Sequence, residues 1–305
     1  PSGFFIHHMQ SSGKQTILQI PRRFTRAEWG GTESVVLHTS QELKRRGYDV
    51  RILTSDLLSS PGEEQFDGVT VRRFHGFYPR LGLSEDAKKK LDIRGGNYFS
   101  MGLFWTLLKT KNLKAIHLHT GGFIGAMGRL VARLRGVPYV ISIHGGQAEL
   151  PKEQLDQLLA PLKGTFNWGK ILEILFSMNR VHADANAIIS LGAGEQEKLQ
   201  EKYPDTKVVV LPNGVDFRRF SSADGAAFRK KYELGSAPVI LCVGSFHKQK
   251  NQLTLLEAFA KLHRTSMPDA KLVLIGVVYD EAYFSRLSAR AEELGFRFVS
   301  AESAL

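Results

Sequence analysis

The sequence of 305 residues contains a single cysteine, Cys242, so the chain cannot form an internal disulfide bond. One cysteine favours a reducing compartment over a disulfide-stabilised secreted fold. No apolar run approaches the roughly 20 residues that a membrane-spanning helix needs. Residues 1–15 lack the apolar core of a signal peptide, so we interpret them as a flexible lead-in and leave His7 and His8 out of the site. We therefore expect a cytoplasmic protein, with peripheral binding to the inner face of a membrane as an open alternative.

Several motifs common in α/β proteins are also missing. The sequence has no G-x-x-x-x-G-K-[ST] phosphate loop, no G-x-G-x-x-G turn, no H-E-x-x-H pair and no pair of cysteines for zinc. It has no G-x-S-x-G nucleophile elbow either. These absences exclude most NTPases, dehydrogenases and hydrolases of the α/β class.

Acidic residues are fewer than basic ones, 30 against 41, which gives a formal net charge of +11. Such a chain attracts anions, so nucleic acid, anionic lipid and phosphorylated substrates all remain open as partners. The basic residues are spread along the sequence, and no RNP, helix-turn-helix or zinc pattern is present, which argues against nucleic acid. A hydrophobic content of 43% is that of a soluble globular protein long enough for two domains.

Strand and helix signals alternate from residue 16 onwards. Short apolar runs predict strands, and apolar residues at helical spacing predict the helices between them. The predicted strands are Thr16–Ile20, Val50–Thr54, Val69–Phe74, Ala115–His119, Pro138–Ile143, Ala187–Leu191, Lys207–Leu211, Val239–Val243, Lys271–Ile275 and Phe296–Ser300. Helices are predicted from about residue 32 to Arg46, within Lys88–Lys114, after Gly121-Gly122 up to Gly136, within Pro151–Val181, from Leu253 and over Glu281–Leu294. The alternation is typical of mostly parallel sheets with right-handed crossovers.

A strong turn signal, Pro212–Asp216, separates two such regions. We predict an N-terminal Rossmann-like domain over residues 16–216 and a C-terminal one over residues 217–305. The second contains only two strand–helix units and one further predicted strand, so we expect it to be incomplete. Its first strand, Val239–Val243, is a continuous apolar run and is predicted to be buried on both faces.

Glycines and polar side chains gather where predicted strands end. Gly30 and Gly31 follow the first strand, and His119 and His144 each end another. The loop after Val239–Val243 carries His247 and three further polar or basic residues but no acid; they are Lys248, Lys250 and Asn251. Together with the free N–H groups of the helix that follows, this loop predicts a phosphate site, while a solvated basic loop is the plainer alternative.

Taken in order, the segments GGTE, HLH, SIHGG, PNGVD and GSFHKQKN resemble the motifs of the family 4 glycosyltransferases. The resemblance covers about Thr16 to Gly295. It implies the GT-B fold, in which two doubly wound Rossmann-like domains face a cleft. It also implies transfer of a sugar from a nucleotide-sugar donor to a lipid, glycan or small-molecule acceptor, with retention at the anomeric carbon and with neither a metal nor another cofactor.

The same resemblance implies roles for single residues. Gly30 and Gly31 are expected beneath the donor diphosphate, and His144 beside the donor sugar as the catalytic-site residue. Lys250 is expected to pair with the donor phosphates. Around it the expected donor-binding residues are Gly244, Ser245 and His247, and the expected acceptor-side or structural residues are His119, Gly145 and Asn213.

Three departures from the family pattern matter, and one of them is that Asn186 and Gly192 stand where the family prefers aspartate and serine. Ser245 stands where the family usually has an arginine, so half of the phosphate clamp is missing or comes from other residues. The two glutamates separated by seven residues are absent from the sequence. We therefore expect a chain truncated within its donor domain and without transfer activity of its own. A nucleotide-sugar epimerase of the same fold and a non-enzymatic protein that binds anions or nucleic acid remain alternatives, and the donor, sugar and acceptor are not identified.

Overall fold

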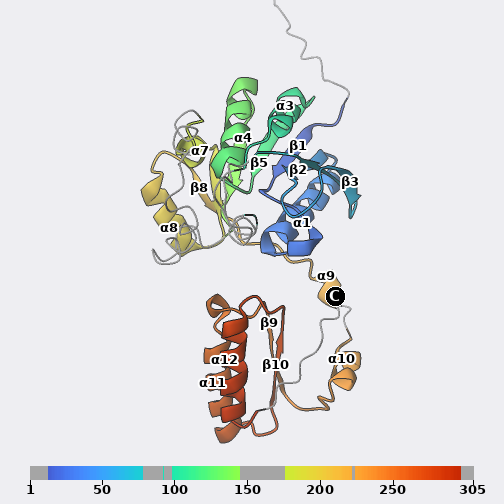
Figure 1. Cartoon of the computed structure of the whole chain (residues 1–305), viewed down its shortest axis with the longest axis vertical. Coiled ribbons are helices and arrows are strands. Elements are labelled where there is room, and N and C mark those ends of the chain that lie inside the picture. The colour runs from blue at the N-terminus through green and yellow to red at the C-terminus, as the bar shows by residue number, and fades with distance from the viewer. Residues whose placement is uncertain (1–12, 78–91, 93–97, 145–175, 222–223, 297–305) are drawn as a thin grey trace, which may run out of the picture. The chain divides into compact units, whose positions relative to one another are not determined.

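The computed structural model describes residues 13–77, 92, 98–144, 176–221 and 224–296 (Figure 1). The chain divides into two compact units, residues 1–215 and residues 216–305, and each is considered by itself. Three predicted features lie wholly or largely outside the described residues. They are Gly145, the helices within Pro151–Val181 and the strand Phe296–Ser300.

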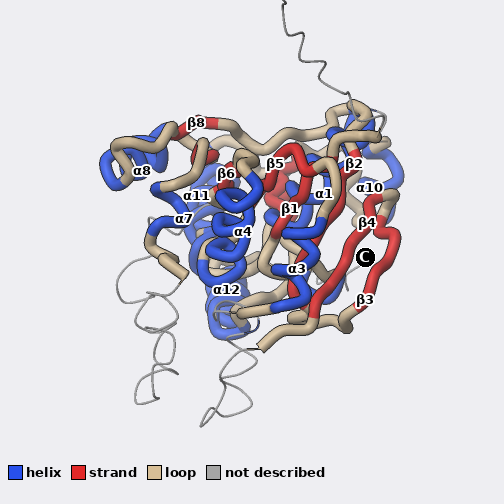
Figure 2. The backbone as a smooth tube through the Cα atoms, turned by 90° about the horizontal axis from the view of Figure 1, so that it is seen from above, coloured by secondary structure: helices blue, strands red, loops and turns tan. Residues whose placement is uncertain are grey.

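The first unit is built on an eight-stranded sheet in the order β3-β4-β2-β1-β5-β6-β7-β8. Its strands are β1 (Thr16–Ile20), β2 (Asp49–Ser55), β3 (Gly62–Phe66), β4 (Val69–Phe74), β5 (Leu113–Leu118), β6 (Tyr139–Ser142), β7 (Ala187–Ser190) and β8 (Val208–Val210). All neighbouring pairs are parallel except β3 with β4. Figure 2 shows β3 and β4 at one edge of the sheet and β8 at the other. The α/β class and the mostly parallel sheet predicted from the alternation are therefore confirmed.

Strand β3 was not predicted. Of its residues GEEQF only Phe66 is buried, so the segment has too little apolar character to read as a strand. It pairs because Asp67 and Gly68 both have positive φ, +46° and +81°, as a two-residue type I′ hairpin turn requires. The Asp-Gly dipeptide between two strand segments was the available signal.

Helices cover both faces of this sheet. They are α1 (Gly31–Arg45), α3 (Met101–Lys109), α4 (Gly122–Arg135), the short α7 (Arg180–Ala183) and α8 (Ala193–Lys202), with a 3-10 turn, η1, at Arg26–Glu28. Ile52 belongs to a core cluster with Val36 and Leu37 of α1, whereas the next residue, Leu53, belongs to the cluster beneath α3 and α4. Because consecutive residues of a strand point to opposite faces, the two clusters lie on opposite sides of the sheet.

A buried ion pair ties α4 to α7. Arg129 is 6% exposed, and its Nε donates to Oδ2 of Asp184 at 2.7 Å, while Nε of Arg180 donates to Oδ1 at 3.0 Å. These hydrogen bonds, that of Arg180 first, hold the pKa of Asp184 below its ordinary value, although burial acts in the other direction. The pair joins the middle of α4 to the end of α7.

The second unit contains two parallel strands, β9 (Val239–Val243) and β10 (Lys271–Ile275). Its helices are α9 (Arg218–Ser221), α10 (Gly225–Lys231), α11 (Gln252–Thr265) and α12 (Glu281–Glu293), with a 3-10 turn, η3, at Lys248–Lys250. Figure 1 shows α11 and α12 side by side against one face of the two strands. The core of this unit is a small cluster made by Phe246, Leu256, Leu287 and Ala291.

The prediction that Val239–Val243 is buried on both faces is wrong for the structure as described. Leu241 is 56% exposed and Val243 is 71% exposed. Helices α11 and α12 cover only one face of the pair of strands, so the side chains that alternate to the other face remain in solvent.

Among the residues that the structure describes, no helix is both long enough and apolar enough to cross a bilayer.

Removing the carboxylate of Asp184 should destabilise the first unit. In Asp184→Ala the buried Arg129 guanidinium loses its counter-charge, and removal of one partner of a buried pair costs about 3–5 kcal/mol. We expect a loss near the lower end of this range in urea denaturation, because Asp184 keeps some exposure. Arg51→Ala, which breaks the exposed pair with Asp49, should cost less than about 1 kcal/mol. Equal losses in the two variants would contradict the structural role of Asp184.

Candidate functional site

The candidate site of the first unit lies at the carboxyl edge of its sheet. β1 pairs with β2 on one side and with β5 on the other, so the strand order reverses at β1. In open parallel sheets, ligands bind outside the carboxyl ends of the strands at such a reversal. The backbone N–H of His119, directly after β5, donates to the carbonyl oxygen of Ile20 at the end of β1, at 3.0 Å. The ends of β1 and β5 are thus held together at the place where the sequence puts its glycines and histidines.

Gly30 and Gly31 form the N-terminus of α1. Gly30 is the N-cap residue, and its N–H donates to Oε2 of Glu33, a buried carboxylate in the first helical turn, at 3.1 Å. An added Cβ on Gly30 would lie 3.3 Å from that same oxygen, so Glu33 already limits the space there. An added Cβ on Gly31 would have nothing within 4 Å, and Gly31 is not among the glycines with positive φ. The fold itself therefore does not need glycine at position 31.

His119 and His144 meet after β5 and β6. Nδ1 of His119 lies 2.8 Å from Nε2 of His144, and their rings stack with centroids 5.0 Å apart. Nε2 of His119 lies 2.6 Å from Oε1 of Gln19, a fully buried residue of β1. The ring of a third histidine, His117, is tilted by 36° against that of His119, with 4.0 Å between the centroids, and its Nε2 lies 2.7 Å from Oγ of Ser142.

Burial keeps this histidine cluster uncharged near neutral pH. It lowers the pKa of His117 to about 4, with a smaller contribution from His144. Burial also lowers the pKa of His119 well below its ordinary value, assisted by His117 and His144, and lowers the pKa of His144. Neutral imidazoles at the edge of a ligand site can orient hydroxyl groups, since each ring has one donor and one acceptor nitrogen.

The candidate site of the second unit lies at the carboxyl end of β9. Lys250 is exposed at the end of η3, and its aliphatic stem lies along Gly244, 3.8 Å from the position of an added Cβ. Ser245 and His247 are half-buried in the same loop, and the ring of His247 lies 5.6 Å from that of Tyr279. The expected donor-binding residues of this unit therefore lie in one loop, immediately before the N-terminus of α11.

Two residues that shape this loop were not singled out from the sequence. Gln252 is 1% exposed, and its Nε2 donates to the carbonyl oxygen of Ser245 at 3.0 Å. A Cβ added to Gly276, after β10, would overlap the carbonyl oxygen of Gly244, so the two strand ends approach at a distance that only glycine permits. In the sequence, the signal for Gly276 was its position directly after the apolar strand Lys271–Ile275, where it indicates only that the strand ends.

In the first unit, Gln19 and His117 were likewise missed as parts of the site. Gln19 interrupts the strand TILQI, and a polar residue in a central strand signals a buried hydrogen bond. The remaining predicted residues are not brought together: Asn213 is exposed in the segment after β8, and Gly145 lies outside the described residues.

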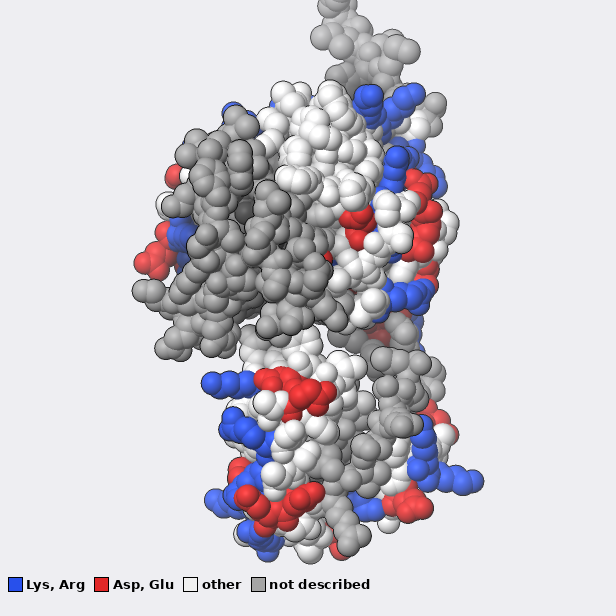
Figure 3. All heavy atoms as spheres, in the orientation of Figure 1, with Lys and Arg blue, Asp and Glu red and all other residues white. Residues whose placement is uncertain are grey.

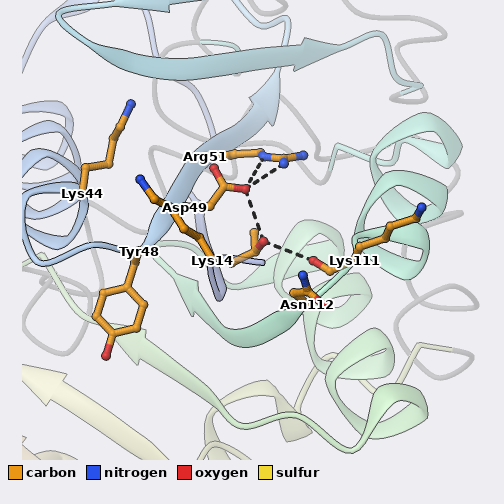
Figure 4. Close-up of a pocket in the computed structure, with 8 residues that line it drawn as sticks. Lys14, Lys44, Tyr48, Asp49, Arg51, Lys111 and Asn112 are labelled. Atoms are coloured by element: carbon orange, nitrogen blue, oxygen red, sulfur yellow. Dashed lines mark hydrogen bonds and ion pairs between the residues drawn. The ribbon is translucent and has the colours of Figure 1, made fainter. Parts of the chain in front are cut away.

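A shallow basic depression lies at the amino edge of the same sheet. It is lined by Lys14, Thr16, Lys44, Tyr48, Asp49, Arg51, Lys111 and Asn112. Figure 4 shows Lys44 at one side of the depression and Lys111 at the other, so these two charges do not converge on one anion. The carboxylate of Asp49 already accepts from Arg51 and Thr16. We therefore assign the site to the carboxyl edge.

Within the ranges that the structure describes, no group of three or more His, Cys, Asp or Glu side chains is arranged to hold a metal ion. The histidines at the carboxyl edge instead bond to Gln19, Ser142 and one another. The absence of a metal requirement stays a prediction.

Two family models match the chain. The Glycosyl transferase 4-like domain matches residues 30–214, and Glycosyl transferases group 1 matches residues 225–298. The chain is 28% identical over 257 residues to the UDP-Gal:alpha-D-GlcNAc-diphosphoundecaprenol alpha-1,3-galactosyltransferase of Escherichia coli, with 81% of this chain and 58% of that protein covered. It is 29% identical to the D-inositol 3-phosphate glycosyltransferase of Kineococcus radiotolerans, with 77% and 52% covered. The chain thus spans between about half and three fifths of these relatives.

Solved structures show the same fold. Anabaena HepE in complex with UDP has a TM-score of 0.61 at 16% identity, with 92% of this chain and 66% of that chain covered. Sucrose-phosphate synthase from Thermosynechococcus elongatus has a TM-score of 0.58 at 16% identity, with 92% and 68% covered. The likeness confirms the GT-B type of α/β fold, and nothing in these comparisons supports the epimerase or the non-enzymatic alternative.

The two glycines should respond differently to alanine. Gly31→Ala places its methyl group in open space at the first position of a helix, so the free energy of unfolding should stay the same or rise by up to about 1 kcal/mol. Gly276→Ala forces the ends of β9 and β10 apart and should cost roughly 1–3 kcal/mol, as overpacking does. Urea denaturation followed by circular dichroism measures both. A clear destabilisation by Gly31→Ala would show that the fold itself needs this glycine.

Proposed function

The chain belongs to the glycosyltransferase family defined by the 4-like domain and the group 1 segment, and from this premise we propose that it transfers a sugar from a nucleotide-sugar donor to an acceptor. The match over residues 30–214 carries the proposal. The geometry supports it, because both units place their glycines, histidines and lysine at carboxyl ends of parallel strands, where nucleotides bind in such folds.

The proposed chemistry needs positive charge where the leaving group forms. When the glycosidic bond breaks, the nucleoside diphosphate develops negative charge, and preorganised donors that face this charge lower the barrier. Lys250 lies exposed before the N-terminus of α11, and Gly244 leaves its stem unobstructed. We assign Lys250 to the donor diphosphate as a point charge, with Ser245 and His247 beside it in the same loop.

In the first unit, the residues that we assign to the donor lie at the carboxyl edge of its own sheet. Gly31 leaves open space before the positive end of α1, which suits a diphosphate. His144 is held by His119 at the edge of the sheet, and we assign it to the reacting face of the donor sugar. Transfer with retention at the anomeric carbon and without a metal completes the proposal.

The names of similar proteins guide the choice of donor. The relative from Escherichia coli is named for a UDP-galactose donor and a diphosphoundecaprenol-linked acceptor, and HepE was solved with UDP. We therefore propose a UDP-sugar as the first donor to test. Calorimetric titration of the chain with UDP should show saturable binding. Release of UDP from UDP-galactose or UDP-glucose when acceptors are offered would show in addition that the chain transfers sugar by itself, contrary to the expectation from its missing glutamates. Absence of UDP binding would contradict the proposal.

Lys250→Ala should weaken the proposed donor site. Loss of one preorganised donor costs about 2.7–4 kcal/mol of transition-state stabilisation, a fall of roughly 100- to 1000-fold in kcat. Lys261→Ala removes an exposed lysine on α11 and serves as the matched control, with unchanged kinetics expected. If the chain binds UDP without turnover, the same two variants are compared by UDP affinity. Equal behaviour of the two would remove Lys250 from the site.

We further propose that the acceptor lies at a membrane surface to which α3 binds. Met101 and Trp105, four residues apart on this helix, are 50% and 48% exposed. Nζ of Lys109 lies 5.6 Å from the ring centre of Trp105. Figure 3 shows a surface free of charged residues at the end of the first unit where α3 lies, with Lys and Arg beside it. Aromatic residues with flanking cations are typical of helices that lie in an anionic interface.

Flotation with vesicles that contain anionic lipid tests this surface. The wild-type chain should float at low salt and float less as salt rises, because the cations are screened. Trp105→Ala should reduce the bound fraction several-fold. Phe220→Ala removes another exposed aromatic residue, on α9 of the second unit, and should bind like the wild type. No binding at low salt would reject the membrane proposal and leave a soluble acceptor.

A further inference from the structure

Gln19 places an amide in the middle of a buried strand. It is 0% exposed, and the residues around it in β1 are almost all apolar. Its Oε1 lies 2.6 Å from Nε2 of His119, and its Nε2 has no hydrogen-bond partner within the described residues. A buried amide costs free energy unless its polar atoms are hydrogen-bonded. Within the described residues, the contact with His119 is the hydrogen bond that offsets part of this cost.

This contact, with Oε1 of Gln19 as the acceptor, implies where the protons lie on two histidines. A carbonyl oxygen can only accept, so Nε2 of His119 carries the hydrogen that it donates to Gln19. A neutral imidazole carries one N–H, which leaves Nδ1 of His119 as an acceptor. Nε2 of His144, 2.8 Å away, must then be the donor. His144 is consequently protonated on Nε2 and bare on Nδ1.

The surroundings keep both rings neutral, so each ring carries a single N–H. His119 is 7% exposed, and burial lowers its pKa well below the ordinary value. Burial also lowers the pKa of the half-buried His144. His117 contacts His119 only through its ring and has its own partner in Ser142, so it does not interrupt the chain of hydrogen bonds.

We propose that Gln19, acting through His119, holds His144 in the Nε2–H tautomer, so that Nδ1 of His144 takes a hydrogen-bond donor from the ligand. A bare nitrogen accepts from a hydroxyl group and offers nothing to a phosphate or carboxylate oxygen. Gln19 and His119 are then positioning residues, and His144 selects a hydroxyl of the sugar over the diphosphate. This consequence for the sugar rests on the proposed function, whereas the proton arrangement does not.

Nitrogen-15 NMR of the histidine rings tests the proposal in the wild-type chain without any ligand. Two-bond and three-bond correlations between ring protons and ring nitrogens distinguish the protonated from the bare nitrogen in each ring. At neutral pH we expect His119 and His144 both as Nε2–H tautomers. The reversed arrangement, with hydrogen on Nδ1 of both rings, or a charged imidazolium at either position, would overturn the proposal.

One variant tests the role of Gln19 itself. Gln19→Met has a similar volume but only a weakly accepting sulfur, so His119 and His144 should lose their single tautomer and show mixed populations. Gln65→Met, on the exposed edge strand β3, is the matched control and should leave the histidine signals unchanged. Unchanged tautomers in Gln19→Met would remove Gln19 from this role.

These measurements separate the inference from the proposed function. The tautomers can be confirmed in a chain that transfers no sugar, and sugar transfer can be confirmed in a chain whose tautomers are reversed. In the first case the arrangement of Gln19, His119 and His144 stands and only its link to a sugar hydroxyl is lost.

Discussion

The pairing of β1 with β5 is the contact on which the candidate site depends. These two strands are far apart in sequence, yet they lie side by side at the point where the strand order reverses. Their pairing continues beyond the last regular residues, through the bond from the His119 N–H to the Ile20 carbonyl. It brings the glycine turn after β1 and His119 after β5 to one edge, and it places Gln19 where its amide meets His119. Without this register the polar residues would lie at the ends of different strands and would not contact one another.

In the second unit, contacts within fewer elements hold the candidate binding loop. Its loop after β9 is held by a buried glutamine that reaches back to Ser245 and by the close approach of Gly276 to Gly244. Both devices leave Lys250 exposed and hold the backbone around it. A basic loop fixed in this way suits a polyanion better than a freely solvated loop does, because less conformational entropy is lost on binding.

Much of the fold could be predicted from periodicity. Strands β1, β4, β9 and β10 begin and end at the predicted residues, and α1 and α4 begin at or beside the predicted glycine turns. The predictions that failed concern partners distant in sequence. The apolar run of β9 gave no information on which of its faces a helix would cover, and the edge strand β3 exists through its pairing with β4.

The candidate site, too, was predictable only where the signal is local in sequence. Glycines and histidines at strand ends identified the edge of the sheet, but the contact between Gln19 and His119 joins residues 100 positions apart. The buried pair of Arg129 and Asp184 joins residues 55 apart. Periodicity and local motifs describe one element at a time, so such contacts become visible only when the strand order is known.

Hydrogen exchange with and without saturating UDP tests the central claim that each unit binds its ligand at the carboxyl edge of its own sheet. The account predicts slower exchange at residues 29–34, which span the glycine turn, and at residues 244–252, which span the loop of Lys250. It predicts no change at residues 44–51 and 111–112, which line the depression at the amino edge. Protection confined to that depression, or bound UDP without protection at either carboxyl edge, would contradict it.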